Sequence, residues 1–209
     1  MATLLQPDLD PERMSKGQRT REEILGAAVR LASVHGLEAL SIGMLATELG
    51  MSKAGLVAHF GNKQALQVAA VDAGRELVRA RIVLPSLAEQ EGLPQFRAFV
   101  QLYFDFIRRR VLPGGCFFTA ISVEFDDQDG PVRERVCVHL RERDDLIASI
   151  IARAQVLGQI RPDADAAQLA FEMVLLMQGA VVRHQLMRDA DILTRAIHAI
   201  DNRIALVST

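Results

Sequence analysis

The chain has 209 residues, of which 50% are hydrophobic and 24% charged, with a formal net charge of −2 and two cysteines. These values allow one or two domains with a sizeable core, argue against indiscriminate nucleic-acid binding, and exclude a disulfide framework or a multi-cysteine zinc site, so a reducing cytoplasm is expected. Few prolines and aromatics, many Ala, Leu, Arg and Glu residues and no long alternating run favour an all-α fold, and we expect no stretch that is apolar enough to cross a membrane.

The first predicted elements are a polar arm and an amphipathic helix. Residues 1–18 contain prolines and are predicted to form a flexible N-terminal arm. A helix is expected over about 19–35, with Gly36 just beyond its end, because apolar residues recur there at helical spacing. The shared apolar face consists of Ile24, Ala27, Ala28, Leu31 and Ala32.

Two short helices are predicted next, over 42–49 and 53–60. Ser41 and Ser52 are good N-caps for them, and Gly50 supplies the backbone freedom that a sharp turn between them needs. A small Ala46 and a shared apolar seam complete the pattern, the seam being Ile42, Leu45, Leu49, Met51, Leu56 and Phe60. This is the pattern of a helix-turn-helix, whose second helix enters the DNA major groove, and an ordinary αα-corner is the alternative.

The flanking sequence resembles the N-terminal domain of the TetR family of bacterial transcriptional regulators. The resemblance covers Thr20 to Leu66, and its most specific part is the HF-x-NK-x-x-L run that ends it. Family members usually carry a Tyr at Val57, whose hydroxyl reaches a DNA phosphate, and a larger polar residue at Ala58. The resemblance implies that residues 19–66 form a DNA-binding domain.

The predicted helix 53–60 supplies the candidates for reading bases. Ala54 and Val57 are candidates for thymine methyl groups, and Lys53 for a guanine edge or a phosphate. Lys63 starts the following helix and is a candidate phosphate partner, with a solvated lysine as the alternative. The other predicted DNA-binding residues are Thr20, Arg21, Ser41, Ser52, Gly55 and His59.

Residues 67–209 are predicted to form a ligand-binding and dimerisation domain, as the resemblance implies. A connection is expected over 85–94, and the whole chain is expected to hold about nine helices. After the first three, they are predicted over about 63–83, 94–112, 116–125, 131–157, 163–187 and 190–206.

Most aromatic side chains fall on 94–112 and 116–125. They are read either as plain core or as the wall of an apolar pocket for a hydrophobic or amphipathic small molecule. The predicted ligand-binding residues are Phe99, Tyr103, Phe104, Phe117, Phe118, Met173, Met177 and His184. No metal or cofactor is expected.

The last two predicted helices, 163–187 and 190–206, are expected to pair with their symmetry mates in a four-helix bundle, where similar proteins dimerise. The predicted function is a ligand-responsive repressor that binds a palindromic operator as a homodimer. A helical protein-interaction adaptor is the alternative, since Val57 and Ala58 depart from the family pattern. An enzyme is not expected, because the histidines are scattered and no nucleophile or phosphate-loop motif occurs.

Overall fold

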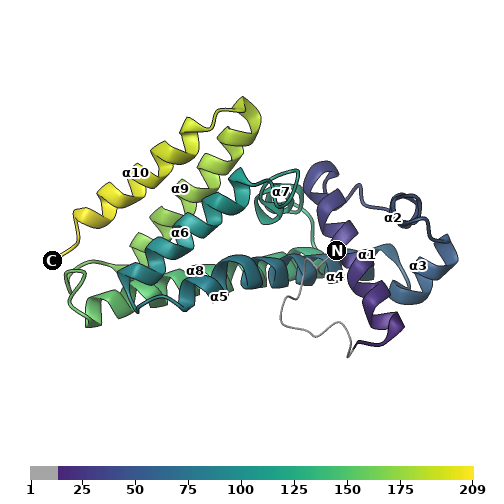
Figure 1. Cartoon of the computed structure of the whole chain (residues 1–209), viewed down its shortest axis with the longest axis horizontal. Coiled ribbons are helices and arrows are strands. Elements are labelled where there is room, and N and C mark those ends of the chain that lie inside the picture. Colours follow the sequence, from purple (N-terminus) through teal and green to yellow (C-terminus); the bar gives the residue numbers. More distant parts are fainter. Residues whose placement is uncertain (1–13) are drawn as a thin grey trace. The chain divides into compact units, whose positions relative to one another are not determined.

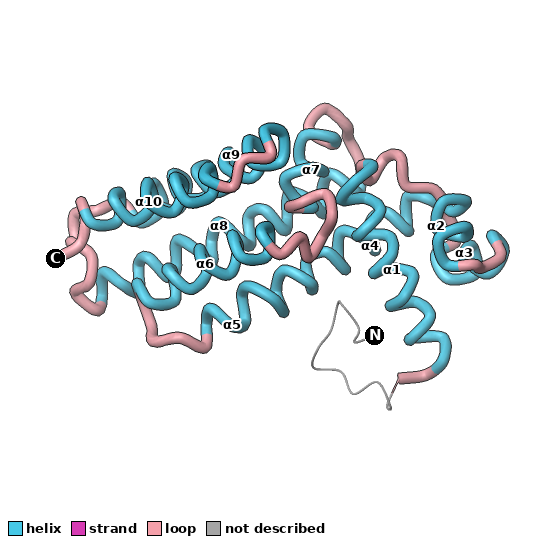
Figure 2. The backbone as a smooth tube through the Cα atoms, turned by 45° about the horizontal axis from the view of Figure 1, so that its top comes forward, coloured by secondary structure: helices cyan, strands magenta, loops and turns pink. Residues whose placement is uncertain are grey.

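A computed structural model describes residues 14–209, and every regular element in that range is a helix (Figure 1, Figure 2). The extended pairing that this range contains is an isolated antiparallel bridge between Ile160 and Ser208. The predicted all-α class is therefore confirmed. Most of the predicted arm, residues 1–13, lies outside the described residues.

The described residues form two compact units that are not contiguous in sequence. The first unit contains the residues up to Ala80 together with Leu112–Cys137, and the second contains Arg81–Val111 together with Val138–Thr209. The predicted domains, 19–66 and 67–209, meet at a single point in the sequence, whereas the first compact unit also includes a later segment. That segment belongs to the first unit because α7 packs against α1 and an ion pair joins the start of α8 to α4.

The helices of the first unit are α1 (Lys16–His35), α2 (Ile42–Leu49), α3 (Lys53–Phe60), α4 (Lys63–Val78), α7 (Phe117–Glu124) and the first turns of α8 (Pro131–Val156). The second unit contains α5 (Leu84–Leu87), α6 (Leu93–Arg108), the rest of α8, α9 (Ala166–Met187) and α10 (Asp191–Ala205).

Polar caps set where the first helices begin. Ser41, Ser52 and Asn62 each accept a hydrogen bond from the backbone N–H three residues later, as expected for N-caps of α2, α3 and α4. The predicted start of α1 near residue 19 is wrong, because Ser15 and Gln18 form a reciprocal capping box that begins the helix earlier. Part of the predicted arm is thus helical.

The helix that was predicted over 63–83 is not α-helical along its whole length. α4 stops at Val78, and a five-residue π-helical segment follows as far as Val83. Pro85 lies in the first turn of α5, where its missing N–H is tolerated. The predicted connection over 85–94 is therefore partly helical.

Two other helix limits also differ from those predicted. α6 ends at Arg108 and not near residue 112, because Arg110 takes a left-handed conformation with φ 49°. α9 begins after Asp165, whose carboxylate accepts two backbone N–H groups, and not after Asp163.

The core of the first unit lies between α1 and the helices around it. Ile24, Ala27 and Ala28 on α1 are fully buried. Three helices, α2, α4 and α7, pack against α1. The predicted seam is buried at Leu45, Leu56 and Phe60 and half-buried at Ile42, Leu49 and Met51.

The core of the second unit is built around α6, α9 and α10. Phe96, Phe99 and Phe104 on α6 are buried, and α9 packs along α10. An ion pair joins these two helices, with Arg203 Nε 2.6 Å from a carboxylate oxygen of Glu172. Hydrogen bonds from Arg203 and Gln168 hold the pKa of that carboxyl below its ordinary value.

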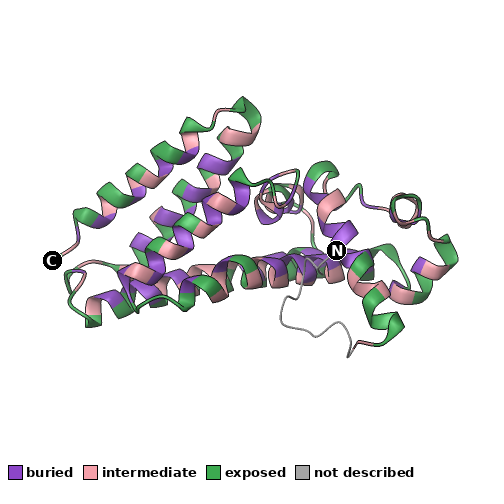
Figure 3. Ribbon diagram, in the orientation of Figure 1, coloured by how far each residue is buried: buried purple, intermediate pink, exposed green. Residues whose placement is uncertain are grey.

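One face of α9 is apolar and exposed. Every third or fourth residue contributes to this outer α9 stripe, which consists of Phe171, Leu175, Gly179, Val182 and Leu186. Leu186 is 82% exposed and Phe171 56%. Exposed positions also run along α10 (green in Figure 3), and they include the polar residues Thr194, Arg195 and His198.

The expectation that no segment is apolar enough to cross a membrane is wrong for α9 on length and composition. Ala166–Met187 contains an 18-residue window with a mean hydropathy of 1.2, of which 39% is buried. The cause is the combination of a buried apolar face with the outer α9 stripe. The half-buried ion pair of Glu172 with Arg203 fits a helix that packs on protein.

Candidate nucleic-acid interface

The eight residues of α3 divide into a buried and an exposed face. Leu56 and Phe60 are buried at 1% and 8% exposure and anchor the helix to the first unit. Lys53, Ala54 and Val57 are exposed, with Val57 at 42%, while His59 and Gly55 are half-buried. Most of the predicted reading positions thus lie on one open face of α3.

The turn before α3 is held by its own backbone. Gly50 takes the left-handed conformation, with φ 63° and ψ 28°, that a side chain would disfavour. The next N–H, of Met51, donates to the carbonyl of Ala46 at 3.0 Å. Ala46 is itself buried at 7% exposure, as the predicted crossing of α2 and α3 requires. This closes the turn in the way a helix-turn-helix needs.

Lys53 is the exposed cation of α3. Within residues 14–209 it forms no ion pair, and its side chain lies over α2, where Lys53 Cε is 3.5 Å from the position of a Cβ built on Gly43. Ser41 and Ser52 use a hydroxyl lone pair for capping and keep their own O–H as a donor. The three side chains are thus free to meet an anion.

Arg21 is engaged with α3. Its Nη1 donates to the carbonyl oxygen of His59 at 2.9 Å, and its guanidinium lies 4.4 Å from the centre of the Phe60 ring. A cation at a helix C-terminus interacts favourably with the helix dipole. Arg21 therefore orients α3. The neighbouring Thr20 donates its hydroxyl to the carbonyl oxygen of Lys16, one turn earlier in α1, at 3.0 Å.

Lys63 is also engaged, in this case with the loop that joins α1 to α2. Its Nζ lies 2.5 Å from the carbonyl oxygen of Glu38 and 2.9 Å from the Glu38 carboxylate. Gln67 donates to the carbonyl of Leu37 at 2.9 Å and to Glu38 at 3.2 Å. Donation from Lys63 and then from Gln67 lowers the pKa of the Glu38 carboxyl.

Acid is expected to remove a small stabilising contribution of Glu38. Its pKa is lowered from 4.5 on folding, so the contribution is complete above about pH 4.5 and is lost as the pH falls through the lower folded value. Because the Glu38–Lys63 pair is exposed, we expect its contribution to the free energy of unfolding to be no more than about 1 kcal/mol. Urea unfolding of the protein and of Glu38→Gln at about pH 7 and about pH 3 should give a difference between them that shrinks in acid. An equal difference at both pH values would contradict this.

The predicted ligand-binding residues are distributed over both units. Seven of the eight are buried at 8% exposure or less: Phe99, Tyr103, Phe104, Phe117, Phe118, Met173 and Met177. Phe117 and Phe118 belong to the first unit and the other six residues to the second. His184 Nδ1 lies 2.8 Å from the carbonyl oxygen of Asp189, the geometry of an N–H donating to the turn after α9. Their role in binding a ligand stays a prediction.

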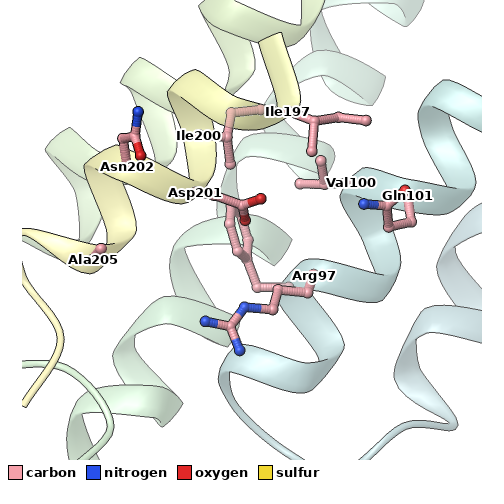
Figure 4. A pocket seen from close by; sticks show the side chains of 9 residues that line it. Arg97, Val100, Gln101, Ile197, Ile200, Asp201, Asn202 and Ala205 are labelled. Atoms are coloured by element: carbon pink, nitrogen blue, oxygen red, sulfur yellow. The ribbon is translucent and has the colours of Figure 1, made fainter. Parts of the chain in front are cut away.

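A groove of about 450 Å³ runs between α6 and α10 in the second unit (Figure 4). Its residues are Phe96, Arg97, Val100, Gln101, Ile197, Ile200, Asp201, Asn202 and Ala205. Buried apolar side chains form the floor and exposed polar ones the rim. Sequence reasoning missed this groove, because none of the predicted ligand-binding residues lines it and only the pairing of α6 with α10 creates it.

The arrangement matches known family models in both parts of the chain. Residues 24–70 match the model of bacterial regulatory proteins of the tetR family, and residues 92–200 match that of the tetracyclin repressor-like C-terminal domain. No curated protein matches the chain.

Solved structures show the same fold over nearly the whole length. A TetR transcriptional regulator from Chloroflexus aurantiacus J-10-FL is 30% identical, with a TM-score of 0.86 over 93% of this chain and 98% of that one. A TetR-family regulator from Cytophaga hutchinsonii (22% identity, TM-score 0.82, 94% and 98% coverage) is similar in fold. So is a putative transcriptional regulator from Saccharomonospora viridis, solved in complex with choline (21%, 0.78, 92% and 99%). With both domain models matched and the helix-turn-helix in place, the chain belongs to the TetR family of bacterial transcriptional regulators.

Proposed function

We propose that the protein is a cytoplasmic repressor that binds a palindromic operator as a homodimer and is released by a small hydrophobic or amphipathic effector. The observation that carries the proposal is the open face of α3, where Lys53, Ala54 and Val57 are exposed while Leu56 and Phe60 anchor the helix. A short helix presented in this way fits the major groove of B-DNA.

The roles of the residues at this face follow from their chemistry. Ala54 and Val57 are apolar and suit thymine methyl groups, and Lys53 suits a phosphate or a guanine edge. The hydroxyls of Ser41 and Ser52 suit phosphate oxygens at the starts of α2 and α3. Val57 offers no hydroxyl, so backbone contacts are fewer than in relatives with Tyr at this position. Arg21 is assigned an orienting role, because its guanidinium already bonds to His59.

One such face is too small for tight binding by itself, which favours a symmetric pair of reading heads on two half-sites. We assign the contact between the two copies to the outer α9 stripe. It is apolar, exposed and long enough to match itself across a two-fold axis, with Gly179 near its middle and open space around that glycine. A dimer contact at this stripe would also shield the apolar face of α9 from water without a membrane.

An effector releases DNA only if it binds the two conformations of the dimer unequally. The apolar residues predicted on α6, α7 and α9 favour a hydrophobic or amphipathic molecule. The choline complex of the Saccharomonospora viridis protein supports a small organic effector through the shared fold. Thermal-shift measurements with uncharged apolar compounds and with highly charged metabolites test this, and stabilisation by the charged set alone would contradict it.

Replacement of Lys53 by Ala is expected to weaken DNA binding about tenfold to a hundredfold, because a phosphate or base partner is lost from each half of the dimer. The probe is a duplex selected from a random library by the unaltered protein. Fluorescence anisotropy over a range of salt concentrations should also show a less steep salt dependence for Lys53→Ala. The matched control is Arg195→Ala, which removes an exposed cation from α10.

The adaptor alternative predicts a different result in the same experiment. If the unaltered protein selects no duplex even at low salt, DNA binding is rejected and a protein partner becomes the better reading. Equal affinity of Lys53→Ala and the unaltered protein would instead remove Lys53 from the interface while leaving DNA binding in place.

A further inference from the structure

Glu124, the last residue of α7, is bonded to the loop that joins α1 to α2. We propose that Glu124 is a positioning residue for DNA recognition, which docks the helix-turn-helix onto α7 and so fixes the orientation of α2 and α3. The proposal rests on the proposed DNA-binding function.

Both carboxylate oxygens of Glu124 are used in this contact. One oxygen accepts the N–H of Leu37 at 2.6 Å, and the other accepts the N–H of Glu38 at 2.8 Å. Two successive backbone donors thus converge on one negative charge from a residue more than 80 positions away. Charge-assisted bonds of this kind are stronger than neutral ones, and the paired geometry also fixes orientation.

The chain leaves room for this carboxylate by having glycine at position 36. Gly36 has φ 87°, and a Cβ built there would lie 2.5 Å from a carboxylate oxygen of Glu124. A side chain at this position would therefore be strained and would also push Glu124 away. The other end of the contact is fixed as well, because Gln128 donates to the carbonyl oxygen of Glu124 at 2.8 Å.

The contact joins two parts of the sequence that belong to different domain models. Glu124 lies within the match to the C-terminal domain, residues 92–200, and Leu37 and Glu38 lie within the match to the N-terminal domain, residues 24–70. All three residues belong to one compact unit. Leu37 and Glu38 lie in the loop that leads within a few residues to Ser41, the cap of α2, and α2 packs on α3.

The same loop is held on its other side by α4. Lys63 and Gln67 bond to its carbonyls and to the Glu38 side chain, while Glu124 takes its N–H groups. All four backbone N–H and C=O groups of Leu37 and Glu38 are therefore hydrogen-bonded, which restricts movement of the loop relative to α4 and α7. In a dimer, such a fixed loop holds α2 and α3 of each copy in one orientation on α7, which narrows the range of half-site spacings that both heads can fit.

The test compares Glu124→Gln with Asp126→Asn. The first change replaces one acceptor oxygen by an NH₂ group that confronts a backbone donor. The second removes the same charge from an exposed carboxylate two residues away that makes no bond within residues 14–209. The probes are the duplex selected by the unaltered protein and a second duplex with one base pair added between its half-sites.

We expect the unaltered protein and Asp126→Asn to lose at least about tenfold in affinity for the longer duplex, because the added base pair rotates one half-site away from its head. For Glu124→Gln, the ratio of the affinity for the selected duplex to that for the longer duplex should fall to about threefold or less. Its binding to the selected duplex should also be weaker. A ratio of two affinities for one protein sample does not change with the fraction of folded protein. An unchanged ratio in Glu124→Gln overturns the proposal.

Amide hydrogen exchange tests the contact without DNA. In Glu124→Gln the amides of Leu37 and Glu38 should exchange at least about tenfold faster, with faster exchange extending into α2, and Asp126→Asn should show no change. Unchanged exchange at residues 37–38 overturns the proposal even if DNA binds. If the unaltered protein selects no duplex, the proposed function fails, and the exchange rates still show whether Glu124 holds the loop.

Discussion

Replacement of Gly114 by Ala is expected to lower the free energy of unfolding by more than about 3 kcal/mol, or to prevent folding. A Cβ built on Gly114 would lie 1.6 Å from the carbonyl oxygen of Ser33 and 2.8 Å from the backbone nitrogen of Val34. The obstacle is backbone at the end of α1, so no side-chain rotation relieves it. The hydrogen bond from Gly114 N–H to Ser33 Oγ, at 3.2 Å, would also be lost.

Denaturant unfolding followed by circular dichroism measures this effect. The control is Gly17→Ala, also a loss of a glycine but at an exposed position in α1 with open space around its Cβ. That change is expected to be neutral or to stabilise by up to about 1 kcal/mol. If Gly114→Ala unfolds within about 1 kcal/mol of the unaltered protein, the close approach of the 112–115 segment to α1 is not present in solution.

Replacement of Leu175 by Glu is expected to convert the proposed homodimer to monomers. Leu175 lies in the outer α9 stripe one turn before Gly179 and is 49% exposed in the single chain. Two-fold symmetry would bury two unpaired carboxylates, which we expect to cost at least about 4 kcal/mol and to raise the dissociation constant of the dimer about a thousandfold. Operator affinity should fall with it, because a monomer reaches only one half-site.

Analytical ultracentrifugation over a range of concentrations gives the dissociation constant directly. Val156→Glu is the control, because it places the same charge at an exposed valine, 75% accessible, at the end of α8. It should leave the dimer intact. A Leu175→Glu protein that dimerises as tightly as the control would move the interface away from α9.

The features predicted correctly from sequence are those set by neighbouring residues. The caps Ser41 and Ser52 and the turn at Gly50 depend on local backbone chemistry, so the limits of α2 and α3 were predictable. The capping box of Ser15 was missed because its surroundings are polar and proline-rich, which favoured an arm.

Other features depend on contacts between distant residues. Glu124 ends an apolar helix and looks like an ordinary surface carboxylate until the fold brings it to Leu37. The exposed side of α9 could not be told from its buried side, because both are apolar. Likewise Arg21 was predicted as a DNA-binding residue, and only the structure shows its bond to His59 on α3. Residues such as Phe99 and Met173 are apolar and periodic whether they fill a core or line a pocket.

The separation of anchoring and exposed residues on α3 has an evolutionary consequence. Leu56 and Phe60 hold the helix, whereas Ala54, Val57 and Ala58 contribute little to the core. Substitutions at these three positions should change stability by only about 0.5 kcal/mol or less. DNA sequence preference can therefore drift, or be reprogrammed in the laboratory, while the rest of the protein keeps folding as before.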